Sequence, residues 1–108
     1  MPLYNPSRVF ANSDGQARTV FNFEVGRHFI TGEQRTFNLL PQLHQIKCPT
    51  LILAGVQDPV CTIEDMQDVA DAIAPGLVQF ERFAEAGHGV FRDELEQALQ
   101  LLRDFITA

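Results

Sequence analysis

CPTLILAGVQDPV, residues 48–60, holds a run of apolar, strand-favouring residues that ends at Ala54-Gly55 and leads into a loop containing Asp58. The centre of the run, residues 51–53, is apolar at consecutive positions. This pattern is typical of a parallel strand whose two faces are both covered. Pro49 precedes the run and Gly55 follows it, and both residue types are common at the ends of strands. The pattern therefore predicts a strand over residues 50–54 with an acidic side chain in the loop that follows it.

A second segment, LVQFERFAEAGHGVF at residues 77–91, has the same order of strand and loop. Its first seven residues alternate in a way that predicts a strand near a sheet edge, and a Gly-His-Gly loop follows. Between the two strands, residues 63–73 are apolar with a helical period, and Thr62 can cap that helix. Residues 93–106 predict a final helix. The order strand, helix, strand, helix predicts an α/β protein with a right-handed βαβ unit and a parallel sheet.

The first part of the chain is less regular. Residues 1–18 are rich in proline, asparagine and glycine, which is loop and turn chemistry. Residues 19–30 predict a helix that Gly26 weakens, and residues 39–46 predict a short helix. The change in character near residue 46 predicts two parts, residues 1–46 and residues 47–108.

Composition excludes several classes of protein. The 108 residues carry a formal charge of −6 with 45% hydrophobic residues, which fits one globular domain and disfavours nucleic-acid or basic membrane-surface binding. No apolar run approaches the roughly 20 residues of a membrane span, and the N-terminus has no apolar signal core. Cys48 and Cys61 form neither a metal motif nor a disulfide framework. We interpret them as reduced thiols and expect a cytoplasmic protein.

Asp58 and His88 form the most informative pair. A histidine serves as a general base when a carboxylate holds its ring in one tautomer, and neighbouring parallel strands bring their C-terminal loops side by side. Alone, Asp58 also fits a turn aspartate before proline, and His88 fits a loop histidine without a role. Together, at the ends of two successive strands, they predict the acid and base of a Ser–Asp–His triad. Gly87 and Gly89 let the backbone turn tightly around the histidine.

The nucleophile of such a triad has no counterpart in these residues. Ser7 and Ser13 are the two serines, and neither lies in a G-x-S-x-G motif. Cys61 is a poor substitute, because it follows Asp58 by three residues on the acid loop rather than on a nucleophile elbow. His28 and His44 show no metal-binding pattern and are interpreted as structural or surface residues. We expect no metal site and no cofactor.

The segments IKCPTLILAGVQDPV (46–60) and AGHGVF (86–91), with the terminal helix, resemble the last two βα units of the α/β-hydrolase fold. The segments FNFEVGRHF (21–29) and GEQRTFNLLP (32–41) resemble the end of the helical cap in the proline iminopeptidase-like branch. The resemblance implies a partial α/β-hydrolase fold with a cap remnant, in which Asp58 is the triad acid and His88 the base.

The same resemblance implies an activity that releases N-terminal residues from peptides, with proline favoured. In that branch, carboxylates of the cap hold the free amino terminus of the substrate. Glu24 is the first candidate for this role and Glu33 the second, although both also fit exposed surface acids. The first strands, the oxyanion-hole turn and the nucleophile elbow of the family have no counterpart here, and Cys61-Thr62 stands where the family carries a proline after the acid.

Three hypotheses remain open. The chain is a C-terminal fragment of a serine hydrolase that is inactive until an N-terminal hydrolase half completes it and supplies a site for a peptide or small-molecule substrate. Alternatively, it is a non-catalytic module that self-associates as a homo-oligomer through an open sheet edge. The third hypothesis is an active enzyme by an unforeseen route, such as a serine supplied by another chain.

Overall fold

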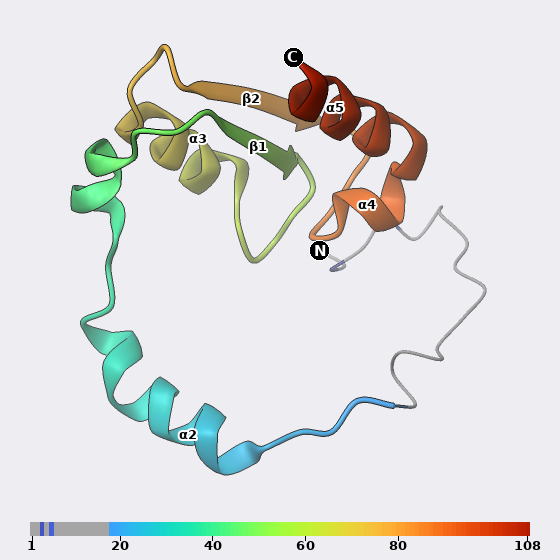
Figure 1. Cartoon of the computed structure of the whole chain (residues 1–108). Helices are drawn as coiled ribbons and strands as arrows, with labels where there is room; N and C mark the ends of the chain where they lie inside the picture. The colour runs from blue at the N-terminus through green and yellow to red at the C-terminus, as the bar shows by residue number, and fades with distance from the viewer. Residues whose placement is uncertain (1–2, 4, 6–17) are drawn as a thin grey trace. The chain divides into compact units, whose positions relative to one another are not determined.

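The computed structural model describes Leu3, Asn5 and residues 18–108 (Figure 1). These residues belong to two compact units. One holds Leu3, Asn5 and residues 40–108, and the other holds the described residues up to Leu39. The first unit carries the sheet.

The sheet consists of two parallel strands within the described residues. Strand β1 (Thr50–Gly55) pairs with β2 (Val78–Phe83), in a register that runs from Thr50 opposite Val78 to Gly55 opposite Phe83. Helix α3 (Ile63–Ala72) connects them. Parallel strands need such a crossover, so the α/β class expected from the sequence is confirmed.

Helix α3 and the 3₁₀ helix η2 (Leu40–Gln45) cover one face of this sheet. The Thr62 side chain caps α3 by accepting a hydrogen bond from the Asp65 N–H at 3.2 Å, as the sequence predicts. The buried residues of this face are Ile52, Ala70 and Ile73, and around them pack Leu43, Ile46, Met66, Val69, Leu77, Val78 and Phe80.

Two helices cover the opposite face. They are α4 (Val90–Asp93) and α5 (Leu95–Thr107), so the single helix predicted over residues 93–106 starts later and is preceded by a separate short turn of helix. The core on this side consists of Phe83, Ala86, Val90 and Ala98, with Leu53 and Leu101 packed against it. Neighbouring residues of a strand point to opposite faces, so β1 contributes to both cores, as its unbroken apolar run predicts.

The second unit is mainly helical. Helix α2 (Phe23–Thr31) is followed by the 3₁₀ helix η1 (Glu33–Arg35). The helix begins later than the predicted residue 19, because Asn22 caps it by accepting a hydrogen bond from the Val25 N–H at 3.2 Å. Within the described residues, no helix is long and apolar enough to cross a membrane.

Candidate active site

Asp58 and His88 lie in the loops that follow the two strands, and their side chains meet. Nδ1 of His88 is 3.0 Å from Oδ2 of Asp58. The Asp58 side chain is 7% exposed and that of His88 is 37% exposed. An ionised carboxylate can only accept hydrogen bonds, so Nδ1 donates and Nε2 is left as the acceptor of the neutral ring. This is the arrangement that a general base requires.

Backbone groups hold the Asp58 carboxylate in place. Its second oxygen, Oδ1, accepts hydrogen bonds from the N–H of Val60 at 2.8 Å and the N–H of Cys61 at 3.0 Å. Burial raises the pKa of Asp58, but the Val60 bond, the His88 bond and charge, and the Cys61 bond together outweigh burial and hold the pKa below its ordinary value. The group is therefore a carboxylate, ready to accept from the imidazole, at neutral pH.

The two loops touch through their backbones. The N–H of Gln57 donates to the carbonyl of Ala86 at 2.9 Å. At Gly55 the approach is closer still, because a Cβ added there would overlap the carbonyl oxygens of Gly87 and Ala86. A residue without a side chain at position 55 is what allows the acid loop and the histidine loop to lie against each other.

We expect Gly55→Ala to force the two loops apart and to lower the free energy of unfolding by about 1–3 kcal/mol, the usual range for an inserted methyl group that has no space. Gly76→Ala is the matched control, because a Cβ at Gly76 meets nothing within 4 Å. Urea unfolding of both variants is the measurement. A Gly55→Ala chain as stable as the control would contradict the close approach.

Asp93 is a site residue that the sequence analysis missed. Asp93 is 5% exposed. Its Oδ2 accepts hydrogen bonds from the N–H of Gly87 at 2.8 Å and from the N–H of Asn5 at 3.0 Å. The N–H of His88 in turn donates to the Leu3 carbonyl at 2.7 Å. The Asp93 carboxylate thus holds the histidine loop through Gly87, and it binds Asn5 to the same loop.

Replacing Asp93 with alanine should leave the buried N–H groups of Gly87 and Asn5 without an acceptor. Each unsatisfied donor costs about 1–3 kcal/mol, so the free energy of unfolding should fall by roughly 2–6 kcal/mol. Asp104→Ala is the control, because the Asp104 carboxylate is exposed and accepts a hydrogen bond from Gln100 on its own helix. Chemical denaturation of both variants checks this, and equal losses would contradict the anchoring role.

A small cavity of about 160 Å³ opens beside the acid–base pair. The C-terminal end of β1, the loops that carry Asp58 and His88, and residues of α3 and α4 surround it. The side chains that line it include Leu53, Asp58, Cys61, Met66, His88 and Val90. The cavity provides space for a reacting group next to the histidine ring.

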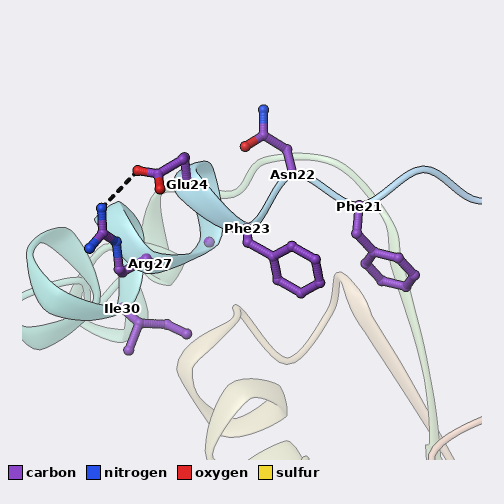
Figure 2. A pocket seen from close by; sticks show the side chains of 7 residues that line it. Phe21, Asn22, Phe23, Glu24, Arg27 and Ile30 are labelled. Atoms are coloured by element: carbon purple, nitrogen blue, oxygen red, sulfur yellow. Dashed lines mark hydrogen bonds and ion pairs between the residues drawn. The ribbon is translucent and has the colours of Figure 1, made fainter.

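The two carboxylates predicted for substrate binding belong to the second unit. Glu24 lies in the first turn of α2 and forms an exposed ion pair with Arg27 at 2.8 Å. Figure 2 shows both residues among those that line a hollow, with the Glu24 carboxylate directed toward Arg27. Phe21 and Phe23 line the same hollow, and their ring centroids are 6.1 Å apart. Glu33 lies in η1 and is exposed. Their predicted roles therefore rest on the sequence resemblance.

The two remaining histidines lie elsewhere. His28 is in the last turn of α2, and Nδ1 of His44 is 2.9 Å from the Pro41 carbonyl on its own 3₁₀ helix. A carbonyl only accepts, so the His44 ring donates through Nδ1.

No protein-family model matches the sequence, and no curated protein matches it either. Solved structures do match. An α/β fold family hydrolase from Bacillus anthracis str. Sterne has a TM-score of 0.67 and 23% identity, over 73% of this chain and 28% of that one. An esterase from Exiguobacterium antarcticum has a TM-score of 0.57 and 35% identity, over 61% of this chain and 24% of that one.

A serine hydrolase involved in carbazole degradation matches 97% of this chain and 43% of its own length, with a TM-score of 0.73 and 16% identity. The chain therefore has part of the α/β-hydrolase fold, as the sequence resemblance implies, and it spans 24–43% of the length of these three structures. None of their names specifies a proline iminopeptidase, so that branch stays a prediction.

Proposed function

We propose that this chain is the C-terminal part of a serine hydrolase and that Asp58 and His88 are the acid and base of its catalytic triad. The observation that supports this most is the 3.0 Å hydrogen bond between the two side chains at the ends of adjacent parallel strands. In such a site, Nε2 of the histidine removes the proton of the attacking serine and later gives it to the leaving group. Asp58 orients the ring and stabilises the imidazolium that forms.

The serine itself has to come from a segment other than these 108 residues. Neither Ser7 nor Ser13 lies in a nucleophile elbow. Without a serine nucleophile the pair has no group to activate and no acyl-enzyme forms, so the chain alone should not hydrolyse esters or amides above background. An N-terminal hydrolase half that carries G-x-S-x-G is the partner that would complete the site.

For the substrate, we propose peptides with a free amino terminus, with proline favoured at the first position. The support is the resemblance of residues 21–29 and 32–41 to a proline iminopeptidase-like cap. The hollow beside Phe21 and Phe23 is apolar, and Glu24 is among the residues that line it, which suits a pyrrolidine ring next to an ammonium group. Binding would require the ammonium to replace Arg27 as the partner of Glu24.

A chimera tests the triad proposal. Residues 40–108 replace the aligned segment of the Exiguobacterium antarcticum esterase, which keeps the remainder of that enzyme. We expect the chimera to hydrolyse p-nitrophenyl acetate, whereas the 108-residue chain does not. A folded chimera without turnover would contradict the proposal. Comparing proline p-nitroanilide with alanine p-nitroanilide, after the cap residues are added, tests the substrate proposal separately.

A self-associating module is the second candidate, and two observations favour it. Only β2 pairs with β1 among the described residues, so the other edge of β1 exposes backbone groups that can pair with another chain. Apolar side chains are also exposed in the second unit, for example Val20 at 93% and Phe23 at 81%. Surfaces of this kind are typical of association sites.

If the open edge drives association, sedimentation velocity at micromolar concentration should show a dimer or larger species whose fraction rises with concentration. The physical reason is that an unpaired parallel strand with a hydrophobic face gains backbone hydrogen bonds and buried area by pairing. A compact monomer at every concentration would contradict self-association and leave the N-terminal hydrolase half as the partner to test.

A further inference from the structure

Cys61 lies closer to the acid–base pair than its place in the sequence suggests. One carboxylate oxygen of Asp58, Sγ of Cys61 and one ring nitrogen of His88 all lie within 4.8 Å of one another. The Asp58 carboxylate causes this, because it accepts the Cys61 N–H at 3.0 Å and so turns the loop back on itself. The result is a group of three different ligand types that line the cavity of about 160 Å³.

We infer that Asp58, Cys61 and His88 form a binding site for a borderline-soft divalent cation such as Zn²⁺. The donor set is one carboxylate, one thiolate and one imidazole, and all three are common zinc ligands. Hard cations such as Mg²⁺ and Ca²⁺ prefer oxygen ligands throughout, so the sulfur and nitrogen donors favour zinc. A carboxylate and a thiolate together also offset the charge of the dication.

The geometry requires only small movements. Zinc binds its ligands at about 2.0–2.3 Å, which places the donor atoms of a tetrahedral site roughly 3–4 Å apart. Asp58 and His88 are already at 3.0 Å, and Cys61 is exposed on a loop, where its side chain can rotate. The cavity leaves space for a water molecule as the fourth ligand, as in zinc sites that keep one open position.

Bound zinc would also occupy the two residues assigned to the triad. Binding itself does not depend on the proposed function, whereas inhibition of a completed hydrolase rests on it. Zinc should therefore inhibit the chimera, because the cation takes the carboxylate that orients His88 and competes for the ring. Cys61 thereby becomes a regulatory residue of the site rather than a substitute nucleophile.

Co²⁺ titration of the reduced, chelator-treated 108-residue chain tests the binding. We expect a near-ultraviolet sulfur-to-cobalt charge-transfer band that saturates at one Co²⁺ per chain and disappears when Zn²⁺ is added. Losing even an outer-shell partner costs a metal site about 10–100-fold in affinity, so Cys61→Ser should weaken binding by at least about 100-fold and remove the band. Cys48→Ser is the matched control and should keep both, because Cys48 is the other exposed thiol.

His88→Gln gives a second readout that does not involve the thiol, and circular dichroism confirms that each variant is folded. We expect His88→Gln to weaken Co²⁺ binding by a similar factor while the charge-transfer band survives at high Co²⁺. The inference is overturned if the band persists in Cys61→Ser, if it is lost in Cys48→Ser, or if His88→Gln binds as tightly as the parent chain. Metal binding without inhibition of the chimera would leave the site standing and count against the triad roles.

Discussion

Replacing His88 with alanine in the esterase chimera should lower kcat by about 10⁴-fold or more, because the serine would lose its general base. Asp58→Asn should cost a similar factor of about 10⁴, since an asparagine amide favours the wrong tautomer of the ring. The two losses should not add in the double variant, because the residues act as one unit. Turnover of p-nitrophenyl acetate under saturating substrate is the measurement.

His44→Ala is the matched control for this series. It removes the other histidine of the same unit. The ring of His44 is hydrogen-bonded to the Pro41 carbonyl on its own 3₁₀ helix. Its kcat should stay within about twofold of the parent chimera. A loss of less than tenfold in His88→Ala would mean that another group removes the serine proton, and the triad role of His88 would be wrong.

Ile52→Lys should abolish the folded state of the 108-residue chain. Ile52 lies in β1, is 8% exposed and packs against Ala70 and Ile73. An ammonium placed there has no partner and is costly to bury, by several kcal/mol even after relaxation. A domain is stable by only about 5–15 kcal/mol, and a two-stranded sheet is marginal on its own. Far-ultraviolet circular dichroism with urea titration should show loss of the cooperative transition.

Gln79→Lys is the control for that substitution. Gln79 lies on the neighbouring strand, one register position away, and is exposed, so a lysine there keeps its charge in water. Its unfolding midpoint should remain close to that of the parent chain. An Ile52→Lys chain that unfolds cooperatively at the parent midpoint would show that the face of β1 towards α3 is not a core.

The parts of the fold with a regular pattern could be predicted from the sequence. β1 is apolar at consecutive positions because both of its faces are covered, and α3 shows a helical period because only one side is covered. Asp58 and His88 could be paired for the same reason, since the ends of successive parallel strands meet at one sheet edge. The two loops also have to lie within reach of each other, and in the structure the missing side chain at Gly55 allows this.

Contacts that depend on loop closure could not be predicted. Asp93 was interpreted as the first residue of a helix, and its partners Gly87 and Asn5 are respectively 6 and 88 positions away in the sequence. The sequence places Cys61 on the same loop as Asp58, three residues after it. It does not predict in which direction that loop turns, and therefore does not predict that the thiol lies near the acid–base pair. Two backbone hydrogen bonds to the Asp58 carboxylate set that direction.

In the second unit, the local sequence pattern predicted the helix but not the residue at which it begins. Residues 19–30 predicted a helix, but Asn22 satisfies the first turn of α2 and starts the helix at Phe23. The cap resemblance assigns Glu24 to substrate binding, and in the structure Glu24 forms an ion pair with Arg27, one helical turn away. An i,i+3 ion pair of this kind is the ordinary outcome for an exposed acid on a helix.

In the proposed triad, the Asp58 carboxylate holds His88 as the Nδ1–H tautomer. Nitrogen-15 NMR of the imidazole rings in the 108-residue chain, at a pH where the rings are neutral, measures which nitrogen carries the proton. We predict an Nδ1-protonated ring for His88 that loses this preference in Asp58→Asn, while the His44 signals stay unchanged. A His88 ring protonated on Nε2 in the parent chain, or one indifferent to Asp58→Asn, would contradict the account.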